Sequence, residues 1–152
     1  MKSQNEWFDE YAVSHQNITN QRIHFVCVPL IFFSIVGLIM SIPAAPIENL
    51  LGFAYPALTN WATPILLILM VFYLRLSFKT FFLMLLFSLL SLYGNYLLSD
   101  VAPLLYTSIA IFVLAWIGQF YGHKLEGKKP SFFKDLQFLL IGPAWVFEKM
   151  SR

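Results

Sequence analysis

Four long runs of apolar residues, separated by short polar or Pro- and Gly-containing stretches, dominate the pattern along the chain. They cover about residues 23–42, 61–78, 80–98 and 101–121. Each run approaches the ~20 residues that a helix needs to cross the ~30 Å hydrocarbon layer of a membrane. The pattern therefore predicts an all-α polytopic membrane protein with about four transmembrane helices, the second and third of which form a hairpin.

The two ends of the chain have a different pattern, which is typical of helices that lie against the membrane surface. Residues 3–15 begin with a capping-box pattern, Ser3 followed by Glu6, and carry aromatic residues on one helical face. Residues 131–150 contain an apolar run that is interrupted by a Gly-Pro pair and flanked by charges. We interpret both segments as interfacial helices, and the whole chain, residues 1–152, as a single membrane domain.

The composition supports a membrane environment. Hydrophobic residues make up 59% of the chain and charged residues only 12%. A soluble domain carries roughly 25% charged residues, about twice as many. So much apolar surface cannot be buried in one small core, and we expect it to be covered by lipid.

The distribution of positive charge predicts the orientation in the membrane. All 10 Lys and Arg residues lie before the first span, at the connection between the second and third spans, or after the fourth span. The loops 43–60 and 99–102 carry Glu48 and Asp100 instead. In a four-span arrangement all the cations fall on one face, which the positive-inside rule makes cytoplasmic. We therefore expect both termini in the cytoplasm, at a bacterial inner membrane or at the endoplasmic reticulum of a eukaryote.

Reporter fusions at residue 1, near residue 52 and at residue 152 test this topology. The two terminal fusions should report a cytoplasmic location and the internal fusion the opposite side, because the cations should remain on the cytoplasmic face. A signal from the opposite side at either terminus would overturn the four-span model.

The chain contains three histidines, and this topology brings all of them to the same edge of the helix bundle. His15 precedes the first span, His24 opens it and His123 closes the fourth span. In one unbroken helix His15 and His24 would lie on opposite faces, since nine residues correspond to about 900° of rotation. They can converge only if the chain turns between them, which Asn17 and Asn20 favour.

Three imidazoles from separate elements predict a metal centre. Neutral imidazole binds zinc, copper, iron and nickel, and three nitrogens leave coordination positions open for oxygen or hydrolytic chemistry. A single interfacial histidine, by contrast, is more often a hydrogen-bonded residue than a ligand. Gly118 and Gly122 would allow another helix to approach closely beside His123. Five polar residues are candidates for a further ligand or for orienting the imidazoles: Glu126, Glu148, Glu10, Gln119 and Asn20.

Two segments resemble the motifs of a known family, the Mpo1-like family (DUF962). The first is Trp7-Phe8-x2-Tyr11-x3-His15-x-Asn17-x2-Asn20-x3-His24-x4-Pro29, and the second is Trp116-x2-Gln119-Phe120-x-Gly122-His123, followed by Glu126 and Pro130. The tail with Gly142, Pro143 and Glu148 is similar to the closing region of the family. The resemblance therefore extends over nearly the full chain.

This resemblance implies a function. The characterised fungal member of the family is a dioxygenase of the endoplasmic reticulum that uses ferrous iron, Fe²⁺, and shortens 2-hydroxy fatty acids by one carbon. The resemblance implies that His15, His24 and His123 are catalytic iron ligands, and that the partners are a 2-hydroxy fatty acid, O2 and membrane lipid. Three cations at the predicted cytoplasmic rim would then steer the carboxylate of the substrate towards the iron: Arg22, Lys124 and Lys128. We expect no nucleic-acid partner, because the short basic stretch suits anionic lipid headgroups.

Two other functions remain open from the residues alone. The chain could be a non-enzymatic membrane scaffold or lipid-binding protein with interfacial histidines, or a haem protein with two axial histidines. The metal content of the purified protein distinguishes the first from the enzyme, and an absorbance spectrum identifies the second.

Overall fold

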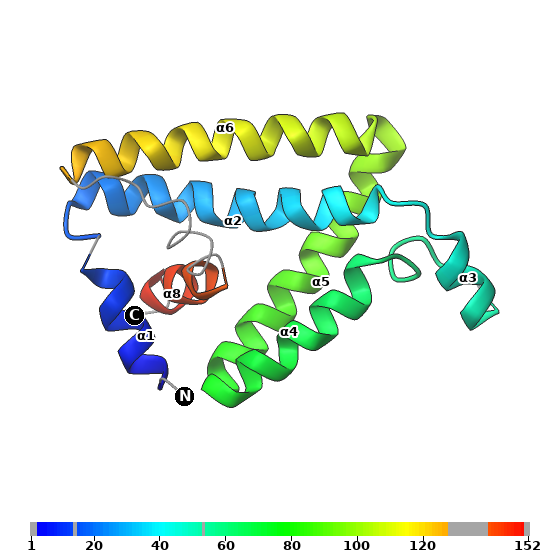
Figure 1. Cartoon of the computed structure of the whole chain (residues 1–152), viewed down its shortest axis with the longest axis horizontal. Helices are drawn as coiled ribbons and strands as arrows, with labels where there is room; N and C mark the ends of the chain where they lie inside the picture. The colour runs from blue at the N-terminus through cyan, green and yellow to red at the C-terminus, as the bar shows by residue number, and fades with distance from the viewer. Residues whose placement is uncertain (1–2, 14, 53, 128–139, 151–152) are drawn as a thin grey trace. The chain divides into compact units, whose positions relative to one another are not determined.

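The computed structural model describes residues 3–13, 15–52, 54–127 and 140–150, and all the regular elements in these ranges are α-helices (Figure 1). This confirms the predicted all-α class. The helices are α1 (Gln4–Ala12), α2 (Ile18–Met40), α3 (Ala45–Leu51), α4 (Ala62–Leu76), α5 (Phe78–Val101), α6 (Leu104–Leu125) and α8 (Ile141–Met150).

Three of the described helices, α2, α5 and α6, are long and apolar enough to cross a membrane. They correspond to the first, third and fourth predicted spans. The second predicted span corresponds to α4, which is apolar but has only 15 residues. The presence of four transmembrane helices therefore stays a prediction, whereas the three long helices support a membrane location.

Ser77 lies between α4 and α5 and caps both, as the C-cap of α4 and the N-cap of α5. The Ser77 backbone is extended, and its Oγ accepts a hydrogen bond from the Thr80 N–H at 3.1 Å. This N-cap satisfies a backbone donor that the first turn of α5 would otherwise leave unpaired. The two helices pack against each other, as the predicted hairpin requires (Figure 1).

The N-terminal helix is shorter than predicted. The capping box of α1 is present, since Ser3 Oγ accepts from the Glu6 N–H while the Glu6 carboxylate accepts from the Ser3 N–H. The helix ends at Ala12 instead of continuing to residue 15, because the chain turns there. At the other end α8 begins at Ile141, and residues 131–139 of the predicted helix lie outside the described part of the chain.

The chain forms two compact units. The first combines residues 1–32 with residues 112–152 and holds all three histidines. The second comprises residues 33–111 and contains α3, α4 and α5. Both α2 and α6 contribute residues to each unit.

Within the second unit, α2, α5 and α6 meet at a glycine. A methyl group at Gly37 would overlap Asn95 Oδ1 and Ser108 Oγ, so only glycine fits the observed packing. The Asn95 side chain is fixed in place, since its Nδ2 donates to the carbonyls of Phe33 (3.0 Å) and Ser91 (2.9 Å). Small residues at such contacts allow membrane helices to approach closely.

Gly37→Ala should therefore destabilise the protein. The added methyl group must displace a hydrogen-bonded Asn95, and such overpacking costs roughly 1–3 kcal/mol of unfolding free energy. Thermal unfolding in detergent measures the loss. Gly94→Ala is the matched control, because its methyl group would meet only the Phe33 ring. Equal stability losses for the two variants would contradict this account of the contact.

Candidate metal centre

Local hydrogen bonds produce the turn that brings His15 back towards α2. The His15 N–H donates to the carbonyl of Ala12 at 3.0 Å, just beyond the end of α1. Asn17 directly precedes α2, and its Oδ1 accepts from the N–H groups of Thr19 (2.9 Å) and Asn20 (3.2 Å). An asparagine side chain in this position is a typical helix cap. The turn predicted between His15 and His24 is therefore confirmed.

Two glycines of α6 bring His123 to the same place. A side chain on Gly118 would overlap Cys27 Sγ, and one on Gly122 would overlap Asn20 Oδ1. The last turns of α6 therefore lie directly against the first turns of α2, as the spacing of the two glycines predicted.

The three histidines form one buried cluster. His15, His24 and His123 are 2%, 1% and 4% exposed. One potential ligand atom from each lies within 4.8 Å of those from the other two. The ring centroids are 4.3 Å apart for His15 and His24, 5.0 Å for His24 and His123, and 5.5 Å for His15 and His123. Metal–imidazole bonds are roughly 2.0–2.1 Å long, so small side-chain movements would let all three share one ion.

Backbone carbonyls fix the tautomer of two of these imidazoles. His15 Nδ1 lies 2.6 Å from the Tyr11 carbonyl, and His24 Nδ1 lies 2.9 Å from the Asn20 carbonyl. A carbonyl oxygen can only accept, so each Nδ1 carries the proton and the ring lone pair is on Nε2. A hydrogen bond of this kind is what orients metal-binding histidines and makes them more basic ligands.

Burial keeps His15 in the form that binds metal. Loss of solvent around the ring lowers the pKa of His15 to about 4, although the hydrogen bond to Tyr11 acts in the opposite direction. The imidazole is therefore neutral at physiological pH. Neutral imidazole is the ligand form, because protonation would remove the lone pair.

Aromatic rings from α1 and α8 cover this cluster. The Tyr11 ring stacks on His15 with centroids 4.1 Å apart and an interplanar angle of 7°. The Trp145 ring lies 5.6 Å from His15 and 5.0 Å from Tyr11. Tyr11 and Trp145 belong to a small core with Val28 and Val146. This apolar cover limits the access of water to the histidines.

Glu126 holds the loop that carries His15. Its Oε1 accepts from the Gln16 N–H at 2.8 Å, and its Oε2 accepts from the Asn17 N–H at 3.0 Å and from Asn20 Nδ2 at 2.9 Å. Burial alone would raise the pKa of the Glu126 carboxyl, but these hydrogen bonds outweigh it and hold that pKa below its usual value. The carboxylate is not part of the three-histidine group and acts on the loop instead.

The other predicted polar residues have distinct positions. Gln119 is buried and its side chain hydrogen-bonds with His24, and Asn20 is buried between His24 and Glu126. Glu148 lies on α8, where it lines a groove next to α1. The proposed steering residues Arg22 and Lys124 are exposed, whereas Lys128 lies outside the described residues.

Three residues near the cluster were not predicted from the sequence: Tyr11 as a stacking partner of His15, and Trp145 and Lys149 on α8. Tyr11 and His15 are four residues apart, which placed them on one face of the predicted N-terminal helix, and Trp145 and Lys149 have the same spacing. These spacings do not reveal that α8 packs beside the histidines.

Comparisons with known proteins identify the family of the chain. No curated protein and no solved structure matches it. A family model does match, over residues 1–152, and its description is "2-hydroxy-palmitic acid dioxygenase Mpo1-like". The resemblance of the two histidine-containing motifs is thus confirmed, and the chain belongs to the Mpo1-like family.

Proposed function

We propose that this protein is an iron-dependent membrane dioxygenase that shortens 2-hydroxy fatty acids by one carbon. The observation that carries the proposal is the buried group of His15, His24 and His123, whose ligand atoms lie within 4.8 Å of one another. The description of the family, which names a 2-hydroxy-palmitic acid dioxygenase, supports the substrate class.

The donor set fits iron. Three neutral imidazole nitrogens leave open coordination positions on a divalent ion, as oxygen-using iron sites require. When bound, Fe²⁺ would supply the site that holds O2 and the hydroxyl and carboxylate oxygens of the substrate. The chemistry also balances, since one O2 suffices to oxidise C2 to a carboxyl group while C1 leaves as CO2 and one water forms.

The residues around the histidines prepare the site for this chemistry. The Tyr11 and Asn20 carbonyls hold the imidazoles of His15 and His24 in one tautomer. Glu126 fixes the loop between α1 and α2, so His15 is positioned before any ligand arrives. The rings of Tyr11 and Trp145 exclude water, which strengthens electrostatic interactions inside the site.

The reaction is tested with purified protein, Fe²⁺ and O2. We expect 2-hydroxypalmitate to be converted to pentadecanoate, identified by mass spectrometry. Palmitate should be a poor substrate, because it lacks the hydroxyl oxygen that would bind beside the carboxylate. Equal turnover of the two acids, or turnover without iron, would defeat the proposed mechanism. A haem absorbance spectrum of the purified protein would instead support the alternative of a haem protein.

A further inference from the structure

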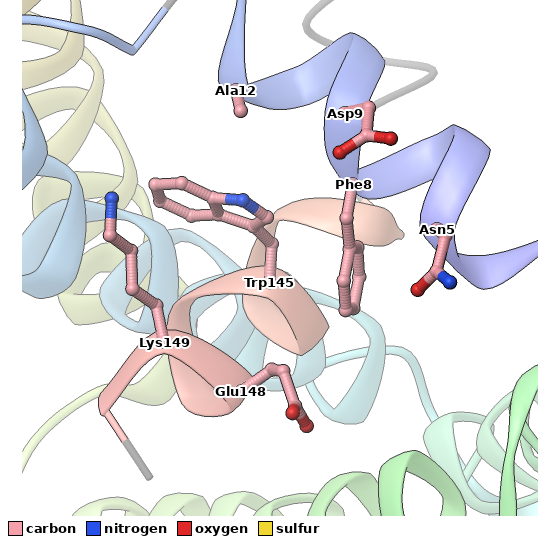
Figure 2. A pocket seen from close by; sticks show the side chains of 7 residues that line it. All are labelled: Asn5, Phe8, Asp9, Ala12, Trp145, Glu148 and Lys149. Carbon is pink, nitrogen blue, oxygen red and sulfur yellow. The ribbon is translucent and has the colours of Figure 1, made fainter. Parts of the chain in front are cut away.

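A groove with charged ends lies between α1 and α8, beside the histidine cluster and within the first compact unit. It has a volume of about 430 Å³ and is lined by Asn5, Phe8, Asp9, Ala12, Trp145, Glu148 and Lys149. The aromatic rings of Phe8 and Trp145 form its middle (Figure 2). Lys149 lies on one side of the Trp145 ring, whereas Phe8 and Glu148 lie on the other (Figure 2). The groove therefore separates a cation from the carboxylates.

Lys149 is held in place by neutral groups. Its Nζ donates to Gln21 Oε1 at 2.8 Å and lies 4.7 Å from the centre of the Trp145 ring. Across the parts of the chain that the structure describes, no carboxylate pairs with this ammonium group. Among the described residues, then, this exposed and oriented lysine has no counter-ion, so its ammonium group can receive an incoming anion.

The same two contacts, with Gln21 and Trp145, connect Lys149 to His15. Gln21 uses its Oε1 for Lys149 and its Nε2 for the His15 carbonyl, at 2.6 Å. The Trp145 ring contacts Lys149 on one side and lies 5.6 Å from His15.

We propose, building on the function proposed above, that Lys149 binds the carboxylate of the 2-hydroxy acid and that the groove between α1 and α8 receives the head of this substrate. The ammonium group pairs with one carboxylate oxygen, which leaves the other carboxylate oxygen and the 2-hydroxyl for the metal, and the Trp145 ring packs against the carbons beyond C2. Lys149 thereby takes the role that the sequence had suggested for Arg22, Lys124 and Lys128.

The experiment measures binding without turnover. Iron-loaded protein is titrated anaerobically with 2-hydroxypalmitate and with its neutral amide, and the Kd is read from tryptophan fluorescence. Lys149→Gln should weaken binding of the acid about tenfold or more, because a charge-assisted hydrogen bond is lost. Binding of the amide should hardly change. Lys149→Arg should restore most of the affinity for the acid.

Three variants serve as comparisons, each with its iron content and thermal stability measured. Lys79→Gln removes an exposed cation of α5 and should leave binding unchanged. Arg22→Gln and Lys124→Gln test the two exposed cations that the sequence had suggested for steering the carboxylate. The proposal is overturned if wild-type protein does not bind the acid, if Lys149→Gln binds it normally, or if the amide is weakened as much as the acid. Normal binding by Lys149→Gln together with continued chain shortening would refute the role of Lys149 alone, whereas Lys149-dependent binding without chain shortening would refute the dioxygenase function alone.

Discussion

Replacing His24 by Ala should reduce the turnover of 2-hydroxypalmitate to background and strongly weaken iron binding. His24 is 1% exposed, its ring lies 4.3 Å from that of His15 and 5.0 Å from that of His123, and it presents a lone pair on a tautomer that the Asn20 carbonyl fixes. Removing it leaves two imidazoles, which cannot replace the third ligand. His123→Ala should have the same effect. Product formation and iron content are measured on the same preparations.

The control for this prediction must separate loss of metal from loss of fold. Val26→Ala changes an exposed residue of the same helix and should retain both activity and iron. Thermal unfolding of the metal-free proteins then shows how much stability each histidine contributes. A His24→Ala protein that is folded and still turns over the acid at the wild-type rate would remove His24 from the site.

Replacing Glu126 by Ala should release the loop that carries His15. The variant loses three hydrogen bonds to a carboxylate, and the backbone N–H groups of Gln16 and Asn17 lose their acceptor. Removal of a group that orients a metal ligand typically lowers metal affinity 10–100-fold. We therefore expect low activity at limiting Fe²⁺ and partial recovery at saturating Fe²⁺, measured as activity against iron concentration.

This iron dependence distinguishes a positioning residue from a ligand. Glu126→Gln keeps one acceptor oxygen and should retain more activity than the alanine variant. Glu10→Ala removes an exposed carboxylate of α1 and should behave like wild type. Activity of Glu126→Ala that no iron concentration restores would instead make Glu126 a ligand, and unchanged iron affinity would show that the loop does not need it.

The convergence of the histidines could be predicted from local signals. The polar Asn17 and Asn20 indicated a turn between His15 and His24, and the Gly118–Gly122 pair indicated a close helix contact beside His123. Both are short-range features with a direct physical reading, and the observed cap and the observed close contact agree with them.

The role of Glu126 could not be predicted in the same way. The sequence suggested Glu126, three residues after His123, as a further ligand or as a residue that orients the imidazoles, but α6 ends at Leu125 and the carboxylate instead reaches the loop before α2. The partners of that loop are more than 100 residues away in the sequence, so no local pattern reveals them. The positions of Trp145 and Lys149 could not be predicted for the same reason, because they depend on the packing of α8 against α1.

The central claim is that three histidines form one iron site, and the iron content of the purified protein tests it most directly. Protein loaded anaerobically with Fe²⁺ and freed of excess metal should contain about one iron per chain. A variant in which His15, His24 and His123 are all replaced should contain almost none. Wild-type protein without bound iron, or a triple variant that retains it, would contradict the account.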